Sequence, residues 1–288
     1  MIKYILLVAL GAISYGALTS FAKIAYKEGY SAGEITFAQA AIGAIMLWVL
    51  VLFRSQKTGV SRWKDAWRLI AYGTTMGISV FCFYLSVNYI PVSLAIVLLM
   101  QISWLSPLTE WLLYKKRLST GQLIAVICMA LGTIMASKLL ENNVHTFSAL
   151  GILLALFAAI MYTAYILLTS RIGEDTPMLE KSALMTTGSA IIILLINVSA
   201  FTSSTHLDLG LLKWGCFLAV FGTVIPPICF TTGMPKIGAG LSAVLLTLEL
   251  PAVVFCAHII LHEAVSILQI TGIIVMIGSI IAIQFFKK

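Results

Sequence analysis

The fold of this chain is decided by a stretch that occurs twice: ILLVALGAISYGA at residues 5–17 and ILLALFAAIMYTA at residues 152–164. A shift of 147 residues makes the two stretches identical at 7 of 13 positions. The same shift matches residues 82–129 with residues 229–276 at 11 of 48 positions. A constant shift at both ends indicates two copies of one unit, which we place at residues 1–140 and 141–288.

The composition indicates a membrane protein. Hydrophobic residues make up 60% of the chain and charged residues 10%, against about 45–50% and about 25% in soluble domains. Windows of about 20 residues, the length that crosses the hydrocarbon core, predict ten membrane-spanning helices. The expected spans are 4–23, 35–53, 69–88, 92–113, 120–137, 147–169, 182–201, 210–231, 238–261 and 266–285. We therefore expect an all-α integral membrane protein.

Five expected spans fall in each copy, and this odd number has a consequence for orientation. A second copy with an odd number of spans must lie in the bilayer the other way up from the first. Two inverted five-helix repeats are the plan of many secondary transporters. The chain also lacks the Gly-x4-Gly-Lys-Ser/Thr phosphate-binding loop, so the sequence gives no sign that ATP drives the protein.

The positive charges predict the topology. The net charge is +7, with 18 Lys and Arg residues. If the N-terminus is cytoplasmic, 14 of these 18 lie in cytoplasmic segments and 4 lie outside, which is the bias that membrane proteins show. The distribution favours both termini in the cytoplasm and contact with the lipid bilayer, and it disfavours a nucleic-acid partner.

Two local patterns concern helix packing. Gly73 and Gly77 form a small-xxx-small pair, which predicts close packing of the third span on a neighbouring helix. Pro226 and Pro227 in the eighth span interrupt the helical hydrogen bonds and predict a hinge or an unwound stretch near mid-membrane.

Several motifs resemble one family. Ser14-Tyr15-Gly16 with Ser20-Phe21, Leu248-Glu249-Leu250-Pro251, and Gln269 to Gly272 are similar to signatures of the Drug/Metabolite Transporter superfamily, specifically its ten-helix bacterial EamA-type members. The resemblance implies transport of small metabolites through a central cavity in the bacterial cytoplasmic (inner) membrane, often export of amino acids or related compounds, without a cofactor. The chain departs from the family pattern at Gln39, where many members have Arg, and at Lys116 and His262.

Glu249 is the clearest ionisable group within an expected span. It lies near the middle of the ninth span, just before Pro251, where a charged side chain is costly unless it faces a cavity or a partner. Glu249 either lines a cavity, where it binds a substrate amine or takes up a proton, or accepts structural hydrogen bonds from a neighbouring helix. Lys23, at the end of the first span, either faces the cavity as a second coupling candidate or extends to the membrane interface.

The other candidates are polar or aromatic residues expected at mid-membrane. They are candidates because buried Tyr and Gln side chains need polar partners, which a substrate supplies, although helix packing supplies them too. The full substrate-binding set is Tyr15, Ser20, Gln39, Ser79, Gln101, Trp104, Tyr162, Tyr165 and Glu249.

The sequence thus favours a secondary transporter of small organic metabolites that works by alternating access. Two alternatives stay open: a membrane-embedded enzyme that uses Glu249 with His258 and His262, and a channel. We expect no metal site, because the two histidines lack the adjacent Glu of metalloprotease helices and the second lies at an expected membrane-exit turn. The oligomeric state is not indicated.

The predicted topology can be tested with cysteines introduced one at a time. An impermeant thiol reagent applied to intact cells should modify a cysteine at Asn142, outside the cell, and should not modify one at Lys57, in the cytoplasm, because basic residues are retained inside. The opposite labelling pattern would mean that the orientation is reversed.

Overall fold

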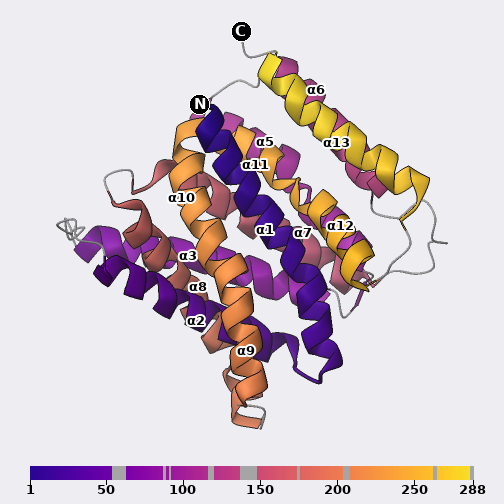
Figure 1. Ribbon diagram of the computed structural model, residues 1–288. Coiled ribbons are helices and arrows are strands. Elements are labelled where there is room, and N and C mark those ends of the chain that lie inside the picture. The colour runs from indigo at the N-terminus through magenta and orange to yellow at the C-terminus, as the bar shows by residue number, and fades with distance from the viewer. Residues whose placement is uncertain are drawn as a thin grey trace.

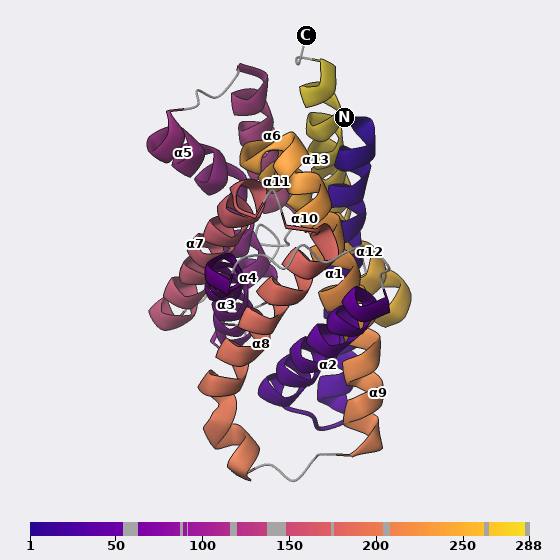
Figure 2. The same ribbon diagram turned by 90° about the vertical axis from the view of Figure 1, so that its left-hand side faces the viewer.

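The computed structural model describes residues 1–53, 63–86, 89–90, 92–115, 120–136, 148–173, 176–203, 208–261 and 265–285. Every element in these ranges is helical (Figures 1 and 2). The helices are α1 (Ile2–Lys27), α2 (Ala32–Phe53), α3 (Trp63–Ser86), α4 (Val92–Leu99), α5 (Ile102–Tyr114), α6 (Thr120–Ala136), α7 (Ala149–Arg171), α8 (Met178–Ser203), α9 (Leu209–Leu218), the short π-helix η1 (Ala219–Val224), α10 (Ile225–Ile237), α11 (Ala239–Leu246), α12 (Glu249–Leu261) and α13 (Ile267–Phe285).

Among the described residues, seven helical segments are long and apolar enough to cross a membrane. Three further apolar helices are shorter, at Ile2–Leu18, Val126–Met135 and Ile267–Ser279. These three lie in the first, fifth and tenth expected spans. The all-helical membrane fold is therefore confirmed, and the count of ten spans stays a prediction. The N-terminal end of α1 and the C-terminal end of α13 lie at the same end of the bundle (Figures 1 and 2).

The outer surface of the bundle suits lipid. On α1, for example, Leu6 is 63% exposed and Leu10 is 54% exposed. Large apolar side chains are exposed in the same way along many of the other helices. A soluble protein rarely exposes so much contiguous apolar surface, so this surface indicates contact with hydrocarbon.

Side chains fix where several helices begin. At the start of α2, Glu34 accepts a hydrogen bond from the backbone N–H of Ser31 at 2.8 Å, and the Ser31 hydroxyl accepts one from the backbone N–H of Glu34 at 3.2 Å. Ser266 and Gln269 form the same reciprocal capping box before α13. Asp208 caps α9 by accepting a hydrogen bond from a backbone N–H of its first turn at 2.8 Å.

The two copies break the same helix at the same place. α4 ends at Leu99 and α5 begins at Ile102; α11 ends at Leu246 and α12 begins at Glu249, the same boundaries shifted by 147 residues. We call two residues or helices that are related by this shift mates. The fourth and ninth expected spans are therefore each two helices joined by a turn.

At both breaks a side chain donates a hydrogen bond to a carbonyl of the helix that precedes the break. The carbonyl of Val97 accepts a hydrogen bond from the side-chain amide of Gln101 at 2.9 Å. The carbonyl of its mate, Val244, accepts one from the hydroxyl of Thr247 at 2.7 Å. Because hydrocarbon offers no other hydrogen-bond partner, these side chains make the breaks tolerable within a membrane.

Helix contacts also occur in mate pairs. α1 packs on α10 and α12, and its mate α7 packs on α3 and α5, the mates of α10 and α12. α2 packs on its own mate α8, and α6 packs on its own mate α13 along one edge of the bundle (Figures 1 and 2). Such pairing is expected of two copies related by a pseudo-two-fold axis that passes between α2 and α8 and between α6 and α13. The helices of the two copies are thus interleaved rather than packed as separate bodies.

The α3–α8 contact depends on glycine. A Cβ atom on Gly73 would overlap the main chain of Met185, one on Gly77 would overlap Ser189, and one on Gly188 would overlap the carbonyl of Ile70. The close packing predicted from Gly73 and Gly77 is confirmed, and α8 supplies a glycine of its own. The two main chains approach so closely that no larger residue fits at these points.

We expect Gly188→Ala to lower the free energy of unfolding by about 1–3 kcal/mol, because the added methyl overpacks a main-chain contact. Gly278→Ala is the matched control, since a Cβ there meets nothing within 4 Å. Denaturation of both variants in one detergent measures the difference. Equal effects of the two substitutions would contradict the assigned role of the α3–α8 contact.

Candidate functional site

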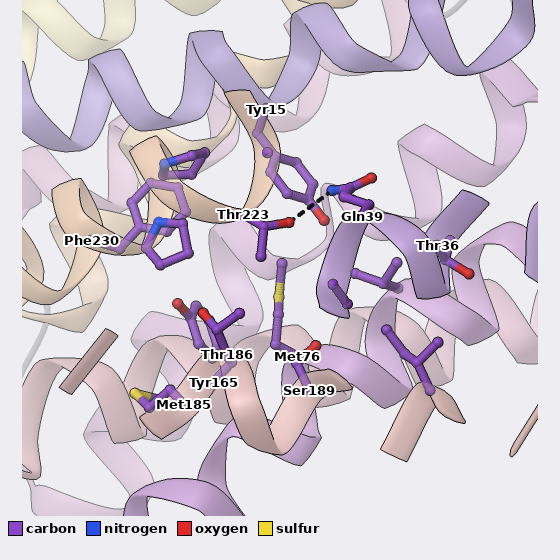
Figure 3. A pocket seen from close by; sticks show the side chains of 16 residues that line it. Tyr15, Thr36, Gln39, Met76, Tyr165, Met185, Thr186, Ser189, Thr223 and Phe230 are labelled. Carbon is purple, nitrogen blue, oxygen red and sulfur yellow. Dashed lines mark hydrogen bonds between the residues drawn. The ribbon is translucent and has the colours of Figure 1, made fainter. Parts of the chain in front are cut away.

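Two adjoining cavities occupy the middle of the bundle. They share Tyr15, Gln39, Met76 and Val80 in their walls, and we call them together the central cavity. The larger one encloses about 560 Å³ of space between side chains, including the open solvent at its mouth. Figure 3 shows side chains that converge on this space from several helices.

The central cavity lies at mid-membrane depth. Met76 is at the midpoint of the apolar segment Ala66–Ser86, and Thr223 is at the midpoint of Leu209–Ile237. Glu249 lies close to the midpoint of Ala239–Ile260.

The walls of the central cavity are built from mates. The pairs in which both members line it are Tyr15/Tyr162, Leu18/Tyr165, Gln39/Thr186, Met76/Thr223, Ser79/Pro226, Val80/Pro227 and Phe83/Phe230. Each member of a pair comes from a different copy of the repeat. A site built in this way exists only when both copies are present.

Glu249 is the first residue of α12, directly after the helix break. Its side chain lines the central cavity and is 7% exposed, and its Oε2 atom has no hydrogen-bond partner in the described structure. A Cβ on Gly16 would overlap the Glu249 carbonyl, so α1 packs directly on this point. A buried carboxylate oxygen without a partner is costly, and its position at a cavity wall indicates that a ligand or water completes it.

Tyrosine side chains surround the Glu249 carboxyl. Tyr15, Tyr84 and Tyr162 all lie within range of its charge. The hydroxyl of Tyr162 is buried without a hydrogen-bond partner, and its ring centroid is 6.2 Å from that of Tyr165. This part of the cavity therefore combines one carboxyl group, aromatic rings and a free hydroxyl.

The larger part of the cavity carries neutral hydrogen-bonding groups. The side-chain amide of Gln39 donates to the hydroxyl of Thr223 at 3.2 Å (Figure 3). Gly222 and Thr223 belong to the π-helix η1, which directly precedes Pro226 and Pro227 at the start of α10. The segment Leu209–Ile237 is thus irregular beside the two prolines but stays helical throughout, and the predicted hinge stays a prediction; π-turns are frequent at functional sites.

The remaining predicted site residues lie in different places. Ser79 lines the smaller cavity, but its hydroxyl donates to the carbonyl of Ala158 at 2.8 Å. Gln101 and Trp104 line neither cavity; the indole N–H of Trp104 donates to the Gln101 side chain at 2.6 Å, and Trp104 is 38% exposed. The side chains of Ser20 and Lys23 lie outside the described residues.

Glu110 is the kind of interfacial, paired carboxylate that the sequence suggests, but its partners were not anticipated. Glu110 on α5 accepts a hydrogen bond from Arg171 at 2.8 Å through Oε1 and from the backbone N–H of Gly240 at 3.1 Å through Oε2. The Arg171 guanidinium lies 3.8 Å from the ring centroid of Tyr114. The cluster joins α5 of the first copy to α7 and α11 of the second. Its members are 61 and 130 residues from Glu110 in the sequence, so no local pattern reveals it.

The histidines give no metal site in the part of the chain that the structure describes. No group of three or more His, Cys, Asp or Glu side chains there could hold a metal ion. His258 lies in the last turn of α12, and His262 and Glu263 lie outside the described residues, as do Lys57, Lys116 and Asn142.

A helical membrane protein with a small-molecule cavity shared by two repeats belongs, by class, to the membrane transporters. The comparison with known families agrees: the chain belongs to the EamA-like transporter family, whose model matches twice, at residues 2–138 and 149–285. The two matches begin 147 residues apart. Family membership points to a transporter of small molecules rather than to an enzyme.

Individual proteins are related more distantly. The chain is 21% identical over 276 residues to the uncharacterized transporter YcbK of Bacillus subtilis (strain 168), which covers 91% of this chain and 86% of that protein. A protein of known crystal structure superposes with a TM-score of 0.81 and 16% identity over 98% of both chains. This structural likeness shows the fold alone.

The free hydroxyl of Tyr162 provides a test of the site. We expect Tyr162→Phe to change the free energy of unfolding little, because the removed hydroxyl has no partner to lose, and to weaken ligand binding. Ser79→Ala is the control and should cost about 1 kcal/mol, since it removes the hydrogen bond to Ala158. Chemical denaturation of both variants checks this; a larger loss of stability for Tyr162→Phe would mean that its hydroxyl is a structural group.

Proposed function

We propose that the protein is a secondary transporter of small organic metabolites, working by alternating access of the central cavity between two inverted five-helix repeats, residues 1–140 and 141–288. The observation that carries the proposal is a cavity built from mates and containing a buried, unpartnered carboxylate oxygen of Glu249. A carboxylate with nearby tyrosines suits an amino group. Amino acids or related compounds, moved out of the cytoplasm, are the substrates we propose.

Alternating access requires a contact that closes one end of the cavity and can open. The Glu110 cluster supplies it, because it ties one copy to the other with charge-assisted hydrogen bonds and lies at the ends of α5 and α7. The predicted topology places these ends at the cytoplasm. The mates of Glu110 and Arg171 are Ala257 and Ile24, which cannot form an ion pair. The charged closure therefore belongs to one side only.

The opposite end is held by exposed contacts between α1 and α9. The indole of Trp214 donates to Glu28 at 2.6 Å, and the hydroxyl of Tyr30 donates to Asp208 at 2.8 Å. The backbone N–H of Leu211 and the Tyr30 hydroxyl hold the pKa of Asp208 below its usual range. Because this pKa is lowered, the Asp208 carboxyl is charged at neutral pH. Its contact with Tyr30 is lost only as the pH falls through the lowered pKa. Exposed contacts of this kind contribute little to stability, so they open more readily than the buried cluster.

Glu249 is also our candidate for coupling to protons, with Lys23 as the second candidate from the sequence. A substrate ammonium and a proton cannot occupy the same carboxylate, so binding one favours release of the other. The groups that face Glu249 are Tyr15, Tyr84 and Tyr162, and none of them carries a positive charge. Exchange of proton for substrate at Glu249 would couple export to a proton gradient.

We expect Glu249→Gln to abolish the pH dependence of transport while the protein stays folded, because the amide keeps the shape and removes the titration. The substrate is first identified by a thermal-shift screen of amino acids and amines. Everted membrane vesicles, which take up an exported compound, then measure its transport across a range of pH. Glu180→Gln, which changes a carboxylate of α8 that lines neither part of the cavity, is the control and should keep the wild-type profile. An unchanged profile in Glu249→Gln would reject Glu249 as the coupling residue.

A further inference from the structure

The central cavity is symmetric in shape but not in charge. Glu249 is the one Asp, Glu, Lys, Arg or His residue among the described residues that line it. Its mate is Ile102, which is fully buried and apolar. The two repeats therefore present one negative group to a ligand, from the side of the second copy.

The larger part of the cavity, which Glu249 does not line, can hydrogen-bond but cannot neutralise a negative charge. It carries hydroxyl and amide groups from three elements: Thr36 and Gln39 of α2, Thr186 and Ser189 of α8, and Thr223 of η1. Of these, Gln39 and Thr223 are bonded to each other at 3.2 Å. Such groups bind an amide, a hydroxyl or an ether, and the apolar side chains of Met76 and Val80 between the two parts of the cavity suit an aliphatic segment.

A zwitterion fits this arrangement poorly. A free carboxylate buried in the cavity would lie in the same small volume as the Glu249 carboxylate and would find no cationic partner among the described lining residues. Burying a charge without a partner is strongly unfavourable. An ammonium group, in contrast, meets the free Oε2 of Glu249 and the rings of Tyr15 and Tyr162, which is favourable geometry for a cation.

We propose that the central cavity selects organic ammonium ions whose other end is uncharged, so that among amino acids and related compounds it takes those whose carboxylate is absent or masked. This inference rests on the proposed transport function and narrows its substrate class. The ammonium group binds Glu249 within the tyrosines, and the neutral polar end faces Gln39 and Thr223. No step beyond binding and release is required.

Three probes of one shape test the charge requirement: leucinamide is a cation, leucine is a zwitterion and N-acetyl-leucine is an anion. We expect leucinamide alone to raise the melting temperature of the purified full-length protein in a concentration-dependent way. Glu249→Gln should weaken its binding roughly 10- to 100-fold, because a charge-assisted contact is lost. Glu180→Gln, which changes a carboxylate of α8 that lines neither part of the cavity, should bind leucinamide as the wild type does.

Three results would overturn the inference. Leucine could stabilise the protein as much as leucinamide does, leucinamide could still bind Glu249→Gln, or leucinamide could have no effect at millimolar concentration. Lys23→Gln adds a further arm: if leucine binds and this variant abolishes its binding, Lys23 is the partner of a substrate carboxylate and the inference falls. If vesicles transported leucine saturably, the substrate class would be wrong but the protein would still be a transporter. If vesicles transported none of the amines, zwitterions or acids tested, the proposed function itself would be wrong.

Discussion

Backbone hydrogen bonds that a membrane cannot replace determine where this bundle is able to open. Hydrocarbon offers no partner to an unpaired carbonyl or N–H, so irregular backbone is tolerated only beside a cavity or where side chains complete it. The breaks between α4 and α5 and between α11 and α12 obey this rule: Leu99 and Glu249, at the two breaks, both line the central cavity. The side chains of Gln101 and Thr247 donate to equivalent carbonyls of the preceding helices, those of Val97 and Val244. A third irregular segment, the π-helix η1, also lines the cavity, through Gly222 and Thr223.

Symmetry explains the shape of the site and asymmetry explains its chemistry. Duplication gives a cavity whose walls are mates, as with Tyr15 and Tyr162. Divergence of the copies then supplies the carboxyl of Glu249 at the cavity wall, the one charged group among the described lining residues, and the Glu110–Arg171 pair at one end of the bundle. In the proposed transport cycle, a charged group in the middle and a charged closure at one end make the two end states inequivalent.

The sequence predicted the helices well, because apolar length and repeat symmetry are properties of the chain itself. The expected span 182–201 lies within α8. The sequence puts Glu249 at mid-membrane depth and makes Tyr15 and Tyr162 mates, and all three side chains line the central cavity. The helix breaks were less predictable. Pro251 marks the second break, but its mate is Trp104, so the first break has no comparable local signal.

Gln101 and Thr223 show two other limits of the sequence. An amide at mid-membrane depth suggested a ligand contact, whereas the Gln101 side chain completes the backbone of its own helix. Thr223 was not predicted, because the wider turn of a π-helix changes which face of the helix the following side chains occupy, and a 3.6-residue period does not anticipate this. The Glu110 cluster depends on residues far apart in the sequence, so only the folded structure reveals it.

The central claim is that one cavity on the symmetry axis is exposed in turn to each side of the membrane. Met76, which lines both parts of that cavity, is a direct reporter when replaced by cysteine in a variant whose five native cysteines have been removed. In sealed vesicles of known orientation, an impermeant thiol reagent should label this cysteine from either face. Labelling from the face that carries the two termini should increase in Glu110→Ala, which removes the charged closure. Labelling from one face only, both with and without the Glu110→Ala substitution, would contradict the account.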